Sequence, residues 1–484
     1  MPIDQATDGG GAFLTRQAST ADIGRLGLAG AGLIGLHLLL SRLSPEFAYD
    51  RLELINRPIW TLVGLGVGTG ALYLLIVRQL RGVSLSGVLL VWVVVVGIAV
   101  RLMMFSTNPM LEDDHYRYLW DGAVTANGFN PYVYIPDDLL REAEDFEEQA
   151  SPIGRLALGS LPVIERVNHG HLRTIYPPVA QGAFALAYWI RPWSLLSWRT
   201  VLLLFDVAAL VLLVVLLRTL GLPSLWLTIY WWNPLLVKEI YNSGHMDVVV
   251  LPFLLAALLL AINKRHIWAV VFLALAVGVK VWAIVLLPLL LRPLVTDPKR
   301  LLLASGLFGL LVLLMFLPIY LSGLNETSGF IAYGKHWEMN DALFMLFLWG
   351  AQLVSPGHAH LVARGVVAIV LGIWVLWVVR KEARGPADLC NRFLFIIAAL
   401  FLLSPTQFPW YYVWLIPFLA IRPYPSLLLL TVLLPLYYSR FYFDAKNVVD
   451  VFDYGIVWLE YVPVWGLLIW EWLVRRKNRS EAGA

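Results

Sequence analysis

The sequence predicts an all-α polytopic integral membrane protein. Hydrophobic residues make up 59% of the 484 positions and charged residues only 14%, whereas soluble domains carry about 25% charged residues. The mean hydropathy is +0.72. Apolar runs of about 20 residues, the length that a helix needs to cross a bilayer core, recur along the chain. Because helices satisfy their backbone hydrogen bonds within one segment, these runs predict spanning helices.

The apolar runs predict a bundle of about 12–14 transmembrane helices. The clearest runs are 24–42, 59–77, 83–105, 201–217, 223–238, 247–262, 301–321, 361–379, 425–438 and 455–474. Two pairs of shorter runs, 268–279 with 281–291 and 393–404 with 409–421, meet at Lys280 and at a proline-containing break. Such pairs are typical of discontinuous helices. Runs 178–190 and 343–354 are short enough to be half-embedded instead.

The basic links between these runs predict the sidedness of the chain, because short cytoplasmic loops are rich in Lys and Arg. If 178–190 and 343–354 do not cross, seven links fall on one side: Arg78/Arg81, Arg218, Lys264/Arg265, Arg292/Lys299/Arg300, Arg380/Lys381/Arg384, Arg422 and Arg475/Arg476/Lys477. We therefore expect a cytoplasmic tail over 1–23, a membrane domain over 24–474 and a basic cytoplasmic tail over 475–484. The net charge of +3 is too small to indicate nucleic-acid binding, and a single cysteine excludes an internal disulfide.

Polar clusters collect on the opposite, extracytoplasmic face. The longest non-apolar segment, 106–177, lies there, and the same face receives 242–247, Lys280, 336–340, 406–407 and 439–442. Ionisable groups at helix ends inside a membrane are costly and mark functional sites. These clusters therefore predict one site on that face.

Asp113 and Asp114 directly follow a predicted span and allow two interpretations. They could act as a general base on a hydroxyl, because crowded carboxylates raise one another's pKa toward neutrality. Alternatively, they are a solvated pair that interacts with a helix dipole. Neighbouring Arg117, Tyr118 and Trp120 favour the base. Glu112 and Asp114 could also hold a divalent metal, but no further set of oxygen ligands is evident, so we expect no metal and no cofactor.

Basic residues elsewhere on this face are candidates for binding a phosphate. Lys280 divides an apolar run, where it could hold a phosphate as a point charge or extend to the interface. His245 and Asp247 could contact a donor or acceptor, or belong to a helix-end network. Arg440, among tyrosines, could face a lipid phosphate or the headgroups.

The remaining clusters suggest carbohydrate contacts. His169 and Tyr176 either touch a substrate or form a plain turn, while Trp337, Glu338 and Asn340 combine an aromatic face with hydrogen-bonding groups. The acidic stretch 137–149 is typical of a solvated surface. No phosphate loop or dinucleotide fingerprint is present, and no soluble segment is large enough for a nucleotide sugar. An activated sugar would therefore arrive on a membrane lipid.

The chain resembles the GT-C superfamily of polytopic glycosyltransferases, and within it the bacterial mannosyltransferase-type members. The motifs that carry the resemblance run in order from about residue 83 to 421: 113–122 (DDHYRYLWDG), 130–132 (NPY), 168–169 with 174–178 (TIYPP), 244–247 (GHMD), Lys280, 337–340 (WEMN) and 404–411 (SPTQFPWY). Three spans precede the acidic motif here, where many relatives have one. The resemblance implies a GT-C-like bundle with an extracytoplasmic catalytic loop.

The resemblance also implies roles for these residues. An acidic residue in the first large extracytoplasmic loop is the catalytic base, which is Asp114 or Asp113; we favour Asp114, because one helical turn places it on the same face as Arg117. Basic residues hold the donor phosphate, with Lys280 first, then Arg117, His245 and Arg440. The expected substrate-binding residues are Tyr118, Trp120, His169, Tyr176, Asp247, Trp337, Glu338, Asn340 and Gln407.

The resulting prediction is a glycosyltransferase that moves a hexose, preferably mannose, from a polyprenyl-phosphate donor to a lipid or glycan acceptor. We expect inversion, no metal requirement, and a bacterial inner membrane location among membrane lipids, with the site facing the periplasm. The main alternative is a transporter or flippase for lipid-linked sugars, which would also contain broken helices and buried charges. The one-sided polar clusters and the lack of an internal repeat argue against it. A non-catalytic assembly subunit, the other alternative, should tolerate loss of Asp113 and Asp114.

Overall fold

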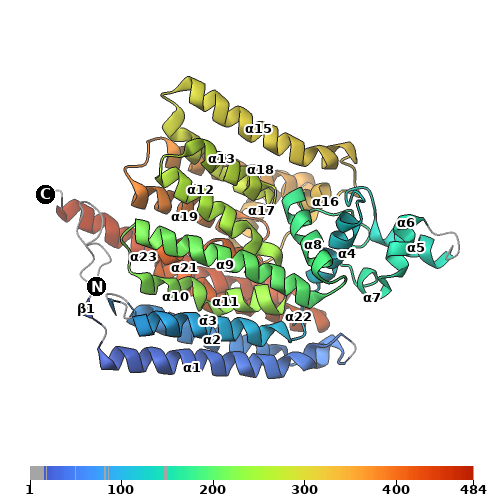
Figure 1. Cartoon of the computed structure of the whole chain (residues 1–484), viewed down its shortest axis with the longest axis horizontal. Coiled ribbons are helices and arrows are strands. Elements are labelled where there is room, and N and C mark those ends of the chain that lie inside the picture. Colours follow the sequence, from blue (N-terminus) through green and yellow to red (C-terminus); the bar gives the residue numbers. More distant parts are fainter. Residues whose placement is uncertain are drawn as a thin grey trace. The chain divides into compact units, whose positions relative to one another are not determined.

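The computed structural model describes residues 16–17, 19–49, 51–80, 83–84, 87–145 and 151–482. Most of the predicted tail 1–23, Arg81 and part of the acidic stretch 137–149 therefore lie outside the described residues. Within them the chain is almost entirely helical (Figure 1). The described strands are a two-residue parallel pair, β1 (Arg16–Gln17) with β2 (Val83–Ser84). The predicted all-α polytopic class is confirmed.

The described part of the chain holds nine helices that are long and apolar enough to cross a membrane, or ten if the bent pair Pro234–Asn242 and Met246–Ile262 forms one span. This is fewer than the expected 12–14. The difference arises where prolines interrupt apolar runs, since proline cannot continue a regular helix. At 223–238 the chain forms α10 (Leu227–Trp231) and α11 (Pro234–Val237), and at 409–421 it forms a 3₁₀ helix followed by α20 (Ile416–Ile421).

The two ambiguous runs form short helices, α8 (Pro178–Ile190) and α17 (Ala342–Val354), of 13 residues each. At 1.5 Å per residue, each is about 20 Å long, less than the ~30 Å core of a bilayer. Each is therefore too short to span alone, as expected for half-embedded helices.

The chain divides into two compact units. The first comprises Met1–Asn108, Leu213–Lys238 and Phe408–Ala484. Its helices, besides α10, α11 and α20, are α1 (Thr20–Leu43), α2 (Ile59–Gln79), α3 (Gly87–Phe105), α21 (Pro425–Leu433), α22 (Ser439–Ala445) and α23 (Val457–Ala482). The side chain of Ser19 accepts from the backbone of Asp22 and so caps the start of α1. Helices α1, α2 and α3 lie side by side in Figure 1.

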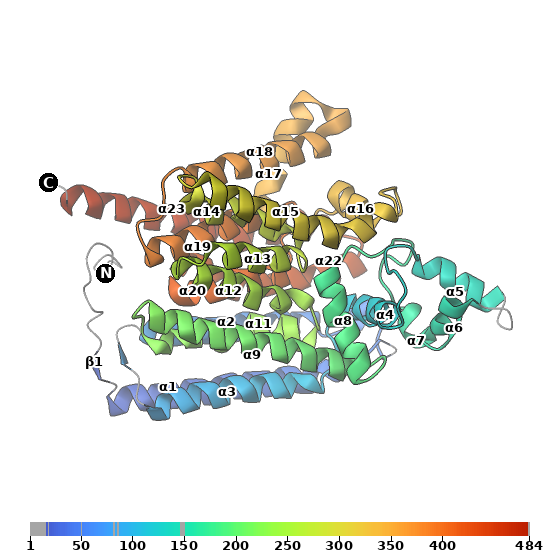
Figure 2. The same ribbon diagram turned by 45° about the horizontal axis from the view of Figure 1, so that its top comes forward.

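The second unit comprises Pro109–Leu212 and Glu239–Gln407. Besides α8, α17 and most of α9 (Leu195–Thr219), it contains α4 (Asp114–Ala126), α5 (Pro136–Asp145), α6 (Pro152–Leu158), α7 (Leu161–Ile164), α12 (Leu251–Ile262), α13 (His266–Val277), α14 (Leu287–Leu291), α15 (Pro298–Leu321), α16 (Gly329–His336), α18 (Ala359–Val379) and α19 (Pro386–Leu403). Figure 2 shows α5, α6 and α7 grouped beyond α4 and α8. All the predicted site residues except Arg440 lie in this unit.

Candidate active site

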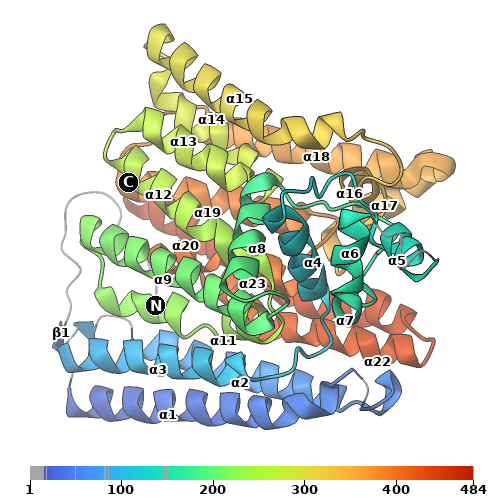
Figure 3. The same cartoon turned by 45° about the vertical axis from the view of Figure 1, so that its right-hand side comes forward.

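The acidic motif forms the start of α4, which packs against α8 (Figure 3). Gly122 permits this packing, because a Cβ there would lie 2.5 Å from the Phe184 carbonyl oxygen. Asp113 is the N-cap residue and Asp114 the first residue of the helix. Both carboxylates therefore stand at the positive end of the helix dipole, which favours their charged forms.

Asn168 joins the two carboxylates. Its Nδ2 donates to Asp114 Oδ1 at 2.6 Å and to Asp113 Oδ1 at 3.0 Å. The Tyr118 hydroxyl, one turn along α4, donates to the other Asp114 oxygen at 3.2 Å. Asp114 is thus oriented by donors from two separate segments. Asn168 was part of a recognised motif but was not among the predicted site residues.

Arg117 supports the loop that carries Asn168. Its Nη2 donates to the carbonyl oxygens of Asn168 at 3.1 Å and His169 at 2.9 Å. His169 has a φ of 50°, a left-handed conformation that costs energy for a residue with a Cβ. Arg117, a predicted phosphate ligand, therefore donates to the backbone of this loop and stabilises its strained turn.

His245 lies fully buried among three carboxylates. Its Nδ1 is 3.5 Å from Asp114 Oδ2, and its Nε2 is 3.9 Å from Glu112 Oε2 and 3.7 Å from Glu239 Oε2. The residue follows a π-helix, Lys238–Asn242, and a turn at Gly244 whose φ is 81°. π-Helical turns are frequent at functional sites. These three carboxylates would repel an anion such as a phosphate. The geometry therefore favours interaction of the His245 imidazole with the acidic residues over binding of the donor phosphate.

Glu239 was missed by the sequence reasoning. It lies at the end of the apolar run 223–238 and is fully buried. An acidic residue at the edge of a membrane-embedded run is a functional candidate by default. That signal, applied to every apolar run, would have identified Glu239.

The two aspartates differ in proton affinity. Desolvation, reinforced by the negative charge of Asp114, raises the pKa of Asp113 to about 6, although the residue as a whole is exposed. Burial acts in the same upward direction on Asp114, but the hydrogen bond and charge of His245, with Asn168 and Lys280, outweigh it and hold the pKa of Asp114 below its usual range. Asp114 is therefore ionised at neutral pH, while Asp113 titrates near pH 6.

Lys280 pairs with Asp247, with Nζ 3.2 Å from Oδ1. Lys280 precedes a 3₁₀ helix, Val281–Leu286, and its side chain is 15% exposed, whereas Asp247 is fully buried. The charge of Lys280 acts on Asp114 as well. These two predicted site residues therefore belong to the same group of charges as the aspartate pair.

An aromatic cluster surrounds the Tyr118 ring. It stacks on Phe184 at 4.8 Å between centroids and meets Tyr176 edge-on at 5.1 Å. Trp120 is almost fully buried and stacks on Trp193 at 6.4 Å. Tyr118 and Tyr176 thus lie next to Asp114, while Trp120 packs against Trp193 from another face of α4.

Trp337 reaches this region through His169, since the two ring centroids are 4.6 Å apart. Glu338 instead contacts Arg364 of α18. The Asn340 side chain donates to the Gln407 carbonyl, and the Gln407 side chain donates to the carbonyls of Leu402 and Ser404. Arg440 lies in α22, in the first unit. Within the described residues, no three His, Cys, Asp or Glu side chains are arranged to hold a metal ion.

Comparison with known proteins gives one match. A family model described as the N-terminal domain of alpha-(1->6)-mannopyranosyltransferases matches residues 52–295. This half of the chain contains the aspartate pair, Asn168, His245 and Lys280. No curated protein and no solved structure matches the chain.

Proposed function

The chain belongs to the alpha-(1->6)-mannopyranosyltransferase family, and on this premise we propose that it moves mannose from a polyprenyl-phosphate carrier to a hydroxyl of a lipid or glycan acceptor. Family membership makes it a glycosyltransferase, and its apolar helices make it an integral membrane protein. The observation that carries the proposal is the orientation of the Asp114 carboxylate by Asn168 and Tyr118, with His245 beside it.

Asp114 is the proposed base. As the acceptor oxygen bonds to the anomeric carbon, the hydroxyl proton passes to the Asp114 carboxylate. The bond between the anomeric carbon and the phosphate oxygen breaks, and its electron pair leaves with the lipid phosphate. One displacement of this kind inverts the anomeric centre. Asp114 suits this role better than Asp113 because both of its oxygens are oriented by neighbouring donors.

Lys280 is the proposed partner of the departing phosphate. A cation at that place stabilises charge that develops in the transition state. Its partial exposure leaves it accessible, and Asp247 keeps it in position. The donor energy resides in the sugar–phosphate bond, so the proposed reaction uses no nucleotide, metal or other cofactor.

The site is proposed to face the periplasm of a bacterial inner membrane. The basic links between the apolar runs support this sidedness under the positive-inside rule. The test is Asp138→Cys in a Cys390→Ala background, labelled in spheroplasts with a membrane-impermeant maleimide. Labelling of Asp138→Cys but not of Lys381→Cys is expected; the reverse pattern would exclude a periplasmic site.

The decisive test is transfer of radiolabelled mannose from synthetic polyprenyl-phosphate mannose by purified protein to extracted membrane lipids and glycans. Asp114→Asn should abolish transfer. Asp138→Asn is the matched control, because Asp138 is an exposed carboxylate of the same loop that pairs with Arg141. Addition of a chelator should leave the rate unchanged. Absence of transfer by the wild-type protein from mannose, glucose and arabinose donors alike would refute the proposed donor class.

A further inference from the structure

The segment 337–340, between α16 and α17, is held from two directions. On one side it pairs with the segment 404–407: the Met339 backbone N–H donates to the Pro405 carbonyl at 2.9 Å, and that of Gln407 donates to the Met339 carbonyl at 2.9 Å. Asn340 adds a side-chain bond to the Gln407 carbonyl at 3.2 Å and has a φ of 56°. The backbone of this segment is therefore fixed.

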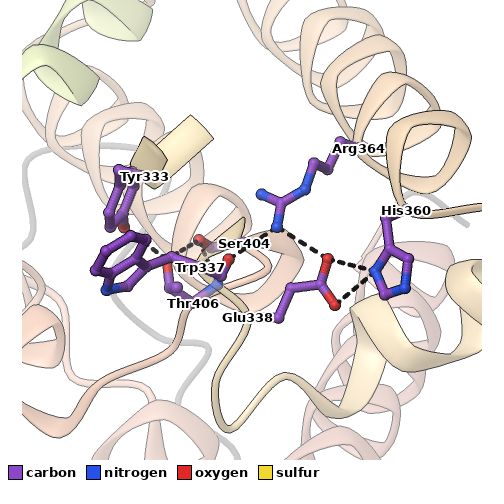
Figure 4. Close-up of polar contacts among 7 residues, drawn as sticks. All are labelled: Tyr333, Trp337, Glu338, His360, Arg364, Ser404 and Thr406. Carbon is purple, nitrogen blue, oxygen red and sulfur yellow. Dashed lines mark hydrogen bonds and ion pairs between the residues drawn. The ribbon is translucent and has the colours of Figure 1, made fainter. Parts of the chain in front are cut away.

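On the other side, the Glu338 carboxylate is held by α18 (Figure 4). Arg364 Nη2 donates to Glu338 Oε1 at 2.9 Å and to the Trp337 carbonyl at 3.0 Å. His360 Nδ1 lies 2.8 and 2.9 Å from the two Glu338 oxygens. The Glu338 and Arg364 side chains are mostly buried, 20% and 14% exposed, so solvent screens this pair only partly. The Glu338 oxygens are thus occupied by protein groups.

This anchoring determines where Trp337 lies. Its indole meets His169 edge-on, with 4.6 Å between ring centroids, and the centroid of the Tyr333 ring lies 5.9 Å from that of Trp337. Tyr333 is itself held through its hydroxyl, 2.6 Å from Thr406 Oγ1. Trp337 remains partly exposed. An aromatic surface of this kind, held rigidly and partly open, suits a sugar ring, which has an apolar face and a polar edge.

The position of His169 indicates which sugar this surface would meet. His169 directly follows Asn168, the residue that bridges the two aspartates. The proposed base must reach the acceptor hydroxyl, so the loop that carries Asn168 and orients this base lies near that hydroxyl. The Trp337–His169 pair therefore adjoins the acceptor side of the reaction.

We propose that Trp337 and His169 form the acceptor-sugar subsite, and that Glu338 and Arg364 are positioning residues that hold Trp337 in it. The assignment to the acceptor rests on the proposed function. Glu338 then acts through Trp337 and does not itself bind the sugar. This revises the expected role of Glu338 as a direct carbohydrate ligand.

The test separates the Michaelis constants of the two substrates, with octyl α-mannoside as the acceptor probe and polyprenyl-phosphate mannose as the donor. Trp337→Ala should raise the acceptor KM about tenfold or more, equivalent to ~1.4 kcal/mol, with kcat and the donor KM within about twofold. Trp337→Phe, which keeps a ring, should show a smaller rise. Glu338→Gln and Arg364→Met should each raise the acceptor KM about threefold to tenfold, because each removes a charge-assisted hydrogen bond.

Glu326→Gln is the matched control. Glu326 pairs with Lys335 of α16 at 2.7 Å, and both side chains are exposed. All kinetic constants of this variant should equal those of the wild type. An unchanged acceptor KM in Trp337→Ala, or an equal rise in the donor KM, would overturn the subsite.

A binding measurement separates this inference from the proposed function. Saturation-transfer NMR on detergent-solubilised protein reports contact with octyl α-mannoside whether or not transfer occurs. Contact seen with wild type and Asp114→Asn but lost in Trp337→Ala would support the subsite even if the donor proves different. Equal contact in all three proteins would refute it while leaving the transferase proposal standing.

Discussion

The two units differ in what surrounds their charged side chains. In the first unit, Arg101 is fully buried and donates to the carbonyl oxygens of Gly97 at 3.0 Å and Trp231 at 2.7 Å, with its guanidinium 3.5 Å from the centroid of the Trp231 ring. In the second unit, Asp113 and Asp114 stand side by side, and Glu112 and Glu239 approach the same imidazole as Asp114.

The difference distinguishes a structural charge from a functional one. Arg101 is surrounded by groups that attract it, so its burial is compensated locally. The carboxylates of the second unit repel one another. Desolvation and the charge of Asp114 raise the pKa of Asp113, whereas His245, Asn168 and Lys280 lower the pKa of Asp114. Perturbed, crowded carboxylates are typical of active sites. Variants of the two groups should therefore lose different properties.

The largest effect is expected for Asp114→Asn. Loss of the base should lower kcat about a thousandfold, while the midpoint of thermal unfolding in detergent stays close to that of the wild type, because Asn keeps the size and much of the hydrogen bonding. Parallel transfer assays and melting curves provide the check. A large drop in the melting midpoint would instead make Asp114 a structural residue and erase the contrast with Arg101.

The next effect is expected for His245→Gln. His245 lowers the pKa of both aspartates, so its loss should raise both pKa values and move the acidic limb of the rate profile, which Asp113 sets, to higher pH. We expect kcat at pH 7 to fall about a hundredfold. The measurement is kcat between pH 5 and 9, with His358→Gln, an exposed histidine of the same unit, as the control. An acidic limb at its original pH would argue against charge coupling between His245 and the aspartate pair.

A stability effect without a catalytic effect is expected for Arg101→Met. The substitution leaves the carbonyls of Gly97 and Trp231 without this donor, which should cost about 1–3 kcal/mol of unfolding free energy. The kcat per folded molecule should match that of the wild type. Fluorescence-detected melting and active-site-normalised assays would check both parts. A reduced kcat in fully folded protein would place Arg101 among the functional charges and break the comparison.

The smallest effect is expected for Asp113→Asn. With a pKa of about 6, Asp113 loses its charge as the pH falls, and the wild-type rate should decline below pH 6. The variant should be about tenfold slower than the wild type at pH 8 and nearly independent of pH around 6. Rate profiles of both proteins give the comparison. A wild-type limb that persists in Asp113→Asn would assign it to another group.

The same pKa affects stability. Because the folded protein binds the Asp113 proton more tightly than the unfolded chain does, this contribution to stability is present below about pH 4 and is lost as the pH rises through 6. Asp113→Asn should remove that dependence. Melting midpoints measured from pH 4 to 7 would reveal the difference in slope.

Local patterns in the sequence were enough to predict the membrane class, the helical spans and the acidic motif. Run length and residue spacing are properties of a single segment. They predict structure because exposing apolar surface to water and unpaired backbone groups to lipid both cost free energy, and both costs arise within that segment. The span count fell short of the expectation where Pro234, Pro409 and Pro417 divide apolar runs. Those prolines are visible in the sequence, but whether a short helix spans depends on its neighbours.

Tertiary structure alone decided the partners within the site. Asn168 reaches Asp114 across 54 positions of sequence, and Glu338 meets Arg364 on a helix beyond α17. No spacing rule links such residues, because their approach depends on how helices pack and where loops turn. The residue types at 113–114, 245 and 280 indicated chemistry from the sequence. Which of them touch, and which carboxylates hold a proton, follows from burial and distance, which exist only in the folded chain.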